Sequence, residues 1–271
     1  MTPGGKLPEG GKGWTGGTGR KAFIGVVGGM GPAAGVLFAQ HLVDLTPAAS
    51  DQDHPSFVLV SRPGEIADRT EFLLGRTATN PGVAIAAHVA DLVQLGATQV
   101  AIPCNTAHAP AILAPVLAVV GAARPPVRLV HLIDTVVAAT HASHAEARRI
   151  GLLSTAGTLR VGLYSNALRD AGLEPVVSTA DEQERLVDPA IRLVKAGQAN
   201  RATDLLARAL DAVVRRGAEV TILGCTELPL AVRGEMPDCV VVDPLVVLAE
   251  AVLSAIGGAD RGGPPFDSAD P

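Results

Sequence analysis

LGATQVAIPCNT, residues 95–106, and RGAEVTILGCTE, residues 216–227, follow one pattern. In each stretch a Gly-Ala pair stands eight residues before a cysteine, and a run of mostly apolar residues lies between them. Each run predicts a short buried strand that ends at its cysteine. Ligands bind at the carboxyl ends of strands in open α/β sheets, so both cysteines are candidates for a ligand site. The local sequence alone leaves each thiol as either a small apolar filler or a nucleophile or base.

The similarity between the two halves continues upstream of these stretches. AFIGVVGGMG, residues 22–31, aligns with RRIGLLSTAG, residues 148–157, and the intervals to the two cysteines nearly agree. A chance likeness between two ordinary αβ units is the alternative explanation. The repeat predicts an α/β fold with two pseudo-symmetric lobes, each a mostly parallel sheet flanked by helices. In this interpretation the active site lies in the cleft between the lobes.

Apolar runs alternate with helical patterns along the chain, as in βαβ units. The expected strands are residues 21–29, 56–61, 98–104, 148–155, 174–178 and 218–225. The expected helices are residues 32–46, 80–96, 157–172, 181–197 and 198–217. Gly96 is the expected stop of the second helix, because glycine accepts the left-handed conformation at a helix end.

The domain organisation follows from this alternation. Residues 21–125 are expected to form the N-terminal lobe and residues 126–243 the C-terminal lobe, with a helix at 244–257 packing back on the N-terminal lobe. Residues 1–20 and 258–271 are rich in Gly, Pro and polar residues and are expected to be disordered tails.

Composition narrows the classes of function. The chain has 271 residues, 48% hydrophobic and 18% charged, with a formal net charge of −5. The mild acidity and the 3% of aromatic residues argue against a nucleic-acid surface. No apolar run is long enough to predict a membrane span. The three cysteines show no disulfide or zinc spacing, and the first twenty residues lack the apolar core of a signal peptide, so a reducing cytoplasm is expected.

Two thiols facing each other across a cleft suit one kind of chemistry. Removing a proton from a carbon next to a carboxylate needs a base on one face, and returning it to the other face needs an acid opposite. A thiol has an ordinary pKa of about 8.5 and can serve in either role after modest tuning. Such a pair would invert a stereocentre.

Six motifs of the chain resemble those of a known family. They are GGMGP (28–32), IADRT (66–70), PCNTAH (103–108), LLSTAGT (152–158), LVKAG (193–197) and LGCTELPL (223–230). Their order and spacing resemble the aspartate/glutamate racemase superfamily, and they are most similar to its cofactor-independent aspartate racemases. Glutamate racemases usually carry histidine where Glu227 stands and an acidic, serine-containing turn in place of GGMGP. Both departures favour the aspartate branch.

The resemblance implies a racemase that needs neither pyridoxal phosphate nor a metal and acts on an acidic amino acid as a homodimer. It implies that Cys104 and Cys225 are catalytic, each the base for one enantiomer and the acid for the other. It implies Arg69 for a substrate carboxylate. The remaining implied substrate-binding residues are Met30, Gly31, Asn105, Thr106, Thr155, Lys195, Thr226 and Glu227.

Several of these residues also have ordinary structural explanations. Arg69 could be a solvated residue at a helix start, and Lys195 could face water on an amphipathic helix. Thr155 and Thr158 could be N-caps, the default role of Ser and Thr at such positions. Glu227 either caps a helix or orients the substrate amino group, and the sequence does not separate the two.

Four further features are more easily read as structural. Cys239 lies in an apolar strand, and Asp68 is expected to support Arg69 or to cap a helix. His108 could be a metal partner but has no third ligand spaced for zinc, which favours a structural role. Residues 29–34 fit the dinucleotide pattern G-x-G-x-x-A, yet no acidic residue ends the next strand as that site requires.

Two alternatives to an aspartate racemase stay open. One is a racemase or epimerase for glutamate or other amino acids in the same superfamily. The other is a binding module that closes on a small ligand without turnover. A binding module should tolerate loss of either cysteine, whereas a racemase should not.

Overall fold

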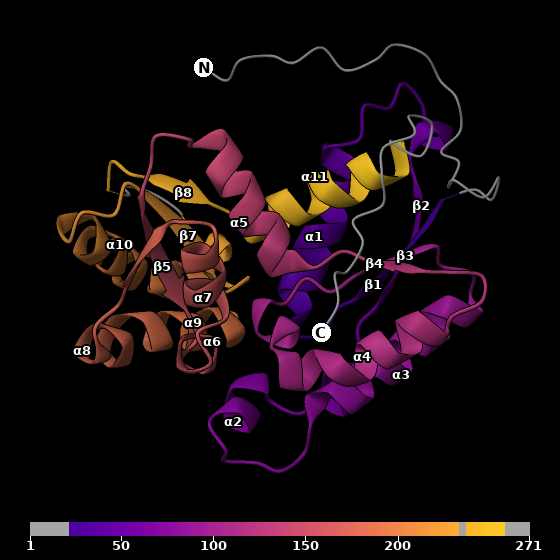
Figure 1. Cartoon of the computed structure of the whole chain (residues 1–271), viewed down its shortest axis with the longest axis horizontal. Helices are drawn as coiled ribbons and strands as arrows, with labels where there is room; N and C mark the ends of the chain where they lie inside the picture. The colour runs from indigo at the N-terminus through magenta and orange to yellow at the C-terminus, as the bar shows by residue number, and fades with distance from the viewer. Residues whose placement is uncertain (1–21, 233–236, 258–271) are drawn as a thin grey trace.

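The computed structural model describes residues 22–232 and 237–257, so both predicted tails lie outside the described residues. The strands of this part form two four-stranded sheets, and every pairing is parallel. The first, in the order β2-β1-β3-β4, consists of Ser56–Val60, Phe23–Val27, Gln99–Ala101 and Arg128–Leu129. The second, in the order β6-β5-β7-β8, consists of Glu174–Val177, Arg149–Ser154, Val220–Gly224 and Val240–Val242. The identical orders confirm the predicted fold of two similar α/β lobes (Figure 1).

The helices connect the strands and cover the sheets. In chain order the α-helices are α1 (Pro32–Asp44), α2 (Arg69–Leu73), α3 (Pro81–Gln94), α4 (Pro110–Ala122), α5 (Leu132–Ser143), α6 (Ala156–Arg160), α7 (Leu163–Asp170), α8 (Ala180–Glu182), α9 (Asp188–Lys195), α10 (Ala199–Arg215) and α11 (Pro244–Gly257). Short 3₁₀ segments are η1 (Asp51–Asp53), η2 (Pro63–Glu65), η3 (Asn105–His108) and η5 (Leu228–Ala231), and a π-helical turn, η4 (Gln183–Val187), lies between α8 and α9.

Three apolar cores hold these layers together. Successive residues of a strand face opposite sides of its sheet, so one strand contributes side chains to two cores. Val27 faces an outer core against α3 and α4, while its neighbour Val26 faces a central core. In the second sheet Leu223 faces an outer core against α9 and α10, while Ile222 faces the same central core. The two sheets therefore share one apolar layer of helices.

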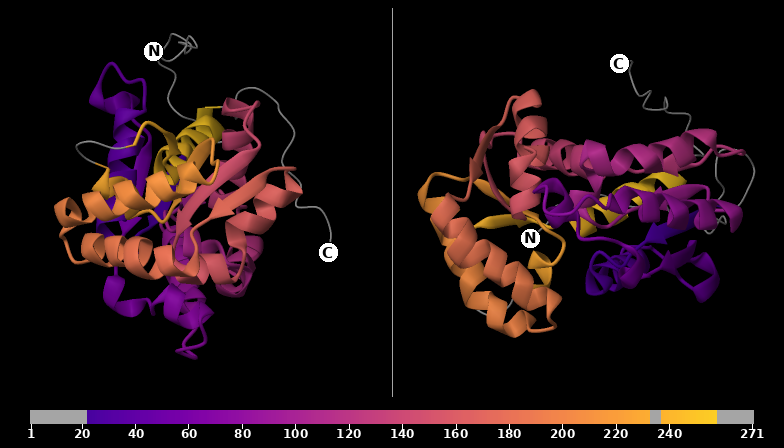
Figure 2. Two further views of the ribbon diagram at one scale, coloured as in Figure 1. Left: turned by 90° about the vertical axis from the view of Figure 1, so that its left-hand side faces the viewer. Right: turned by 90° about the horizontal axis from the view of Figure 1, so that it is seen from below.

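The last helix of each lobe reaches across the central layer. Helix α5 follows the first sheet but packs against α7 of the second lobe. Helix α11 follows the second sheet but packs against α1 of the first lobe, and α5 and α11 contact each other (Figures 1 and 2). This exchange holds the two lobes against each other, with the carboxyl ends of β3 and β7 toward one shared space.

Two glycines stop the helices that lead into those strands. Gly96 follows α3 with φ of 97°, and Gly217 follows α10 with φ of 88°. In both places the glycine N–H and the next N–H return to carbonyls of the preceding turn. The left-handed conformation favours glycine, and the matching geometry at both positions extends the internal repeat to the backbone.

The structure corrects two expectations. The single helix expected at residues 157–172 is broken into α6 and α7, because Gly162 takes a left-handed conformation with φ of 65°. The expected lobe boundary after residue 125 falls before β4, whose pairing with β3 joins residues 128 and 129 to the first sheet.

Each helix of the described residues is too short or too polar to span a lipid bilayer.

Candidate active site

A pocket of about 260 Å³, partly open to solvent, lies where the two lobes meet. Its lining is drawn from both lobes: Met30, Arg69, Thr70, Cys104, Asn105, Thr106, Thr155, Lys195, Cys225, Thr226 and Glu227. All but one of the residues that the sequence analysis gives as catalytic or substrate-binding lie in this lining.

The two cysteines enter the pocket from equivalent places. β3 ends at Ala101, and Cys104 stands directly before the 3₁₀ turn η3. Cys225 follows the last residue of β7. Both side chains are buried, and each belongs to the outer core of its own lobe. The repeated strand-end position therefore brings one thiol from each lobe to one pocket.

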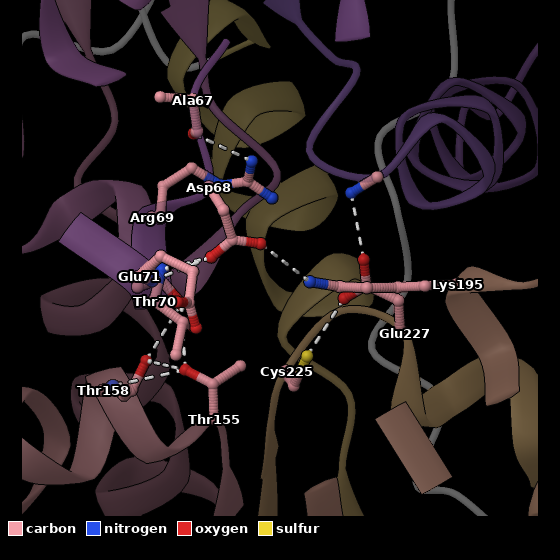
Figure 3. A network of polar contacts seen from close by, with 12 residues as sticks. Ala67, Asp68, Arg69, Thr70, Glu71, Thr155, Thr158, Lys195, Cys225 and Glu227 are labelled. Atoms are coloured by element: carbon pink, nitrogen blue, oxygen red, sulfur yellow. Dashed lines mark hydrogen bonds and ion pairs between the residues drawn. The ribbon is translucent and has the colours of Figure 1, made fainter. Parts of the chain in front are cut away.

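Glu227 links Cys225 to the other lobe. The Cys225 thiol donates to Glu227 Oε2 at 2.9 Å, and the backbone N–H of Gly31 donates to Oε1 at 3.0 Å (Figure 3). Gly31 precedes the first residue of α1, where helix N–H groups favour a negative charge. The amide of Gly31 thus binds Glu227 instead of standing open to a substrate, and it is the one candidate residue outside the pocket lining.

This contact fixes the protonation of Cys225 in the structure. Burial, followed by the negative charge of Glu227 and the hydrogen bond to it, raises the pKa of the Cys225 thiol well above its ordinary value. Lys195 opposes this effect but does not outweigh it. Cys225 is therefore a protonated thiol that is held by its hydrogen bond to the Glu227 carboxylate.

Positive charge gathers at another side of the pocket. Arg69 is the first residue of α2, and its guanidinium donates from Nη1 to the Ala67 carbonyl at 3.3 Å. Its buried Nε has no hydrogen-bond partner among the described residues. Lys195 ends α9, and its Nζ lies 3.9 Å from Asp68 Oδ2, across the lobes (Figure 3). Two cations from different lobes thus line one pocket.

Asp68 holds this corner in place. Its side chain accepts from the backbone N–H groups of Thr70 and Glu71, which makes it the N-cap of α2. Burial alone raises its pKa, but these hydrogen bonds and the charges of Lys195 and Arg69 together lower the pKa of Asp68 below its ordinary value. Asp68 is an ionised support for the two cations, in agreement with its expected role.

Three threonine hydroxyls close a triangle between the lobes. Thr106 Oγ1 lies 3.0 Å from Thr158 Oγ1 and 3.3 Å from Thr155 Oγ1, and the last two are 3.0 Å apart. Thr155 also accepts from the Thr158 backbone N–H and caps α6, as expected of a threonine at a helix start. The triangle fastens the segment after Cys104 to the second lobe.

The match to a family model covers most of the chain. The model of the Asp/Glu/hydantoin racemase family matches residues 27–252. The chain belongs to this family. The match includes both strand-end cysteines and every residue that lines the pocket.

The chain is also similar to individual proteins. The chain is 25% identical over 244 residues to the broad specificity amino-acid racemase RacX of Bacillus subtilis. This match covers 86% of this chain and 97% of RacX. It is 32% identical over 93 residues to an uncharacterized protein of Pectobacterium carotovorum, a match that spans only 61% of that relative and 34% of this chain. The structure of Picrophilus torridus aspartate racemase superposes with a TM-score of 0.75 at 28% identity, covering 87% of this chain and 94% of the other.

His108 supports the cysteine segment of this racemase-family chain from behind. Burial, assisted by the nearby His131, lowers the pKa of His108 to about 3, so its ring is neutral. Its Nε2 therefore donates to the Ile102 carbonyl at 3.1 Å, just before Cys104. The described residues contain no group of three or more His, Cys, Asp or Glu side chains that could hold a metal ion. These contacts favour the structural role of His108.

The buried neutral His108 predicts acid sensitivity of the fold. In the unfolded chain a histidine titrates near pH 6.5, so below that pH the unfolded state binds a proton that the folded state does not bind. The contribution of His108 to the free energy of unfolding is therefore fully present above pH 6.5 and is lost as the pH falls below it. We expect His108 to lower the free energy of unfolding by about 2 kcal/mol between pH 7.5 and 5.0. Urea unfolding of His108→Gln should show a correspondingly smaller pH dependence, and an unchanged one contradicts this account.

Sequence reasoning missed two residues of the site. Thr70 lines the pocket together with Arg69. Its place next to Arg69 in the IADRT motif could have indicated it. Tyr164 of α7 does not line the pocket but donates its hydroxyl to Asn105 Oδ1 at 2.6 Å. No feature of the sequence around Tyr164 indicates that contact, because its partner lies 59 residues away.

Proposed function

We propose that this protein is a cofactor-independent amino-acid racemase that inverts the α-carbon of aspartate by proton transfer between Cys104 and Cys225. The observation that carries the proposal is the pair of thiols from equivalent strand ends in one pocket. A structural thiol needs no counterpart in the other lobe. A reaction that removes a proton from one face and returns it to the other needs one on each side.

The proton transfers balance without a further reactant. The thiolate of one cysteine takes the α-proton, and the electron pair of the broken C–H bond delocalises into the adjacent carboxylate. The thiol of the other cysteine then gives its proton to the opposite face. One thiolate and one thiol remain, with their roles exchanged. Each enantiomer loses its α-proton to one of the two cysteines, so L- and D-aspartate need opposite protonation states of the pair.

The pocket offers donors for the charge that develops on the carboxylate. Asn105, Thr106 and Thr226 follow the two cysteines and line the pocket. Fixed donors that already point at such charge stabilise it more strongly than water does, because water dipoles must first reorient. In this proposal they hold the α-carboxylate between the two thiols.

Arg69 and Lys195 supply the proposed preference for an acidic side chain. Both line the pocket, and the buried Nε of Arg69 lacks a partner among the described residues. A guanidinium binds a carboxylate through two parallel hydrogen bonds, which a neutral side chain cannot reciprocate. The similarity to an aspartate racemase structure agrees with this preference.

Arg69→Gln is expected to raise the KM for aspartate by about tenfold or more, because it removes charge-assisted hydrogen bonds to the side-chain carboxylate. The kcat should change less. The matched control is Arg62→Gln, which removes an exposed arginine that pairs with Asp91. Kinetics of both variants with aspartate check the prediction. An Arg69→Gln enzyme with an unaltered KM contradicts the assignment of Arg69.

The test of the proposed function is a chiral chromatographic assay. The purified protein, with reductant and without added pyridoxal phosphate, is incubated with L-aspartate and L-glutamate in separate reactions. The proposal expects D-aspartate and little D-glutamate. Equal conversion of both, or of many amino acids, replaces it with a broader racemase, for which the likeness to RacX is a precedent. Binding without conversion points to the binding module. The homodimer and the cytoplasmic location stay predictions.

A further inference from the structure

Asn105 presents an unused hydrogen-bond donor at the pocket. Asn105 lines the pocket, and the residue is only 2% exposed. Its amide oxygen accepts from Tyr164, while its amide nitrogen Nδ2 has no partner among the described residues. A buried donor without a partner is costly to stability unless a ligand accepts from it. The unused N–H groups therefore indicate where a substrate oxygen binds.

The orientation of that amide depends on Tyr164. An asparagine side chain can turn over, which exchanges its oxygen and its nitrogen. Tyr164 is completely buried in the central core, and burial, with the charge of Asp243, raises the pKa of its hydroxyl well above the ordinary value. The hydroxyl keeps its proton and needs an acceptor. The Asn105 oxygen, 2.6 Å away, is that acceptor.

We propose that Tyr164 is a positioning residue for the reaction: it holds the Asn105 amide so that Nδ2 faces the pocket and donates to a substrate carboxylate. Tyr164 belongs to α7 of the second lobe and Asn105 to the segment after Cys104 of the first. The bond therefore orients a pocket donor only while the lobes are packed together. This inference rests on the proposed function, since it concerns the same pocket and an anionic substrate.

The chemistry of the pocket explains why the orientation matters. With Nδ2 toward the pocket, the amide attracts a carboxylate oxygen. With the amide turned over, its carbonyl oxygen would meet the substrate carboxylate and repel it. A hydroxyl that never touches the substrate thus selects between an attractive and a repulsive group.

A double-mutant cycle tests the coupling. Tyr164→Phe removes only the hydroxyl and keeps the ring in the core. We expect it to lower kcat/KM about tenfold, mainly through KM, the size of effect that one buried hydrogen bond produces. In the Asn105→Ala background the same substitution should change kcat/KM less than twofold, because the amide it orients is gone. The matched control is Thr140→Val, which removes another buried hydroxyl, bonded to the Val136 carbonyl within α5, and should leave kinetics unchanged.

Asn105→Asp tests the orientation itself. Aspartate has the shape of asparagine and still accepts from Tyr164, but it places an oxygen where Nδ2 stands. We expect it to lower kcat/KM further than Asn105→Ala does. An Asn105→Asp enzyme that is more active than Asn105→Ala means that the oxygen faces the pocket, and this overturns the inference.

The outcomes separate the inference from the proposed function. If the wild type racemises aspartate and Tyr164→Phe has the same effect in both backgrounds, the inference fails and the proposed function stands. If the wild type neither binds nor converts an acidic amino acid, both fail. Loss confined to the wild-type background supports the inference, because a general loss of stability would lower kcat/KM in both backgrounds.

Discussion

Cys104→Ala and Cys225→Ala are each expected to reduce the rate of racemisation by about 10³-fold, the scale of a lost general acid or base. Each direction of the reaction needs one cysteine as base and the other as acid, so either substitution stops both directions. The variants should still bind aspartate, because the side chains proposed to hold its carboxylates remain. Chiral chromatography measures the rates and calorimetric titration the binding.

The chain supplies the matched control for this experiment. Cys239 is its third cysteine; it stands directly before β8 and does not line the pocket. Cys239→Ala should racemise like the wild type. If either pocket variant keeps a tenth of the wild-type rate, the two-cysteine mechanism is wrong for this protein.

Glu227→Gln is expected to lower kcat/KM about 10²-fold, because it removes the charged acceptor that holds the Cys225 thiol in place. Enantiomers have equal free energies, so the loss must be equal for L- and D-aspartate. Glu227 raises the pKa of Cys225, and therefore its neutralisation lowers that pKa. The limb of the pH–rate profile that belongs to Cys225 should move to lower pH.

Glu174→Gln serves as the comparison for this variant, since Glu174 is an exposed partner of Arg149 away from the pocket. Its pH profile should match that of the wild type. A Glu227→Gln profile that keeps its limbs in place, whatever its height, shows that Glu227 does not act on the thiol. The hydrogen bond from Gly31 would then be its main contribution.

The architecture was predictable from the internal repeat, because the repeat consists of patterns between residues that are close in the sequence. Strand-forming runs, the Gly-Ala pairs and the strand-end cysteines recur in both halves, and the structure turns them into two sheets of identical order. The break between α6 and α7 was not predictable from periodicity. The apolar pattern continues through Gly162, and only the left-handed backbone there ends the helix.

The pocket residues were predictable where a motif carries them, and the contacts between the lobes were not. The motifs pointed to Cys225 and Glu227, but the sequence left the role of Glu227 open. That role depends on Gly31, which lies 196 residues away. The bond from Tyr164 to Asn105 joins the lobes in the same way. Such contacts follow from how α5 and α11 pack the lobes together, which no local pattern encodes.

The most direct test of the central claim is deuterium incorporation at the α-carbon during the first few per cent of conversion in D₂O. L-aspartate is incubated with the wild-type protein, and mass spectrometry measures deuterium in both enantiomers after chiral separation. With two cysteines on opposite faces, the D-aspartate formed carries solvent deuterium while the remaining L-aspartate keeps its original proton. Equal early labelling of both enantiomers, or D-aspartate without deuterium, would contradict proton transfer between Cys104 and Cys225.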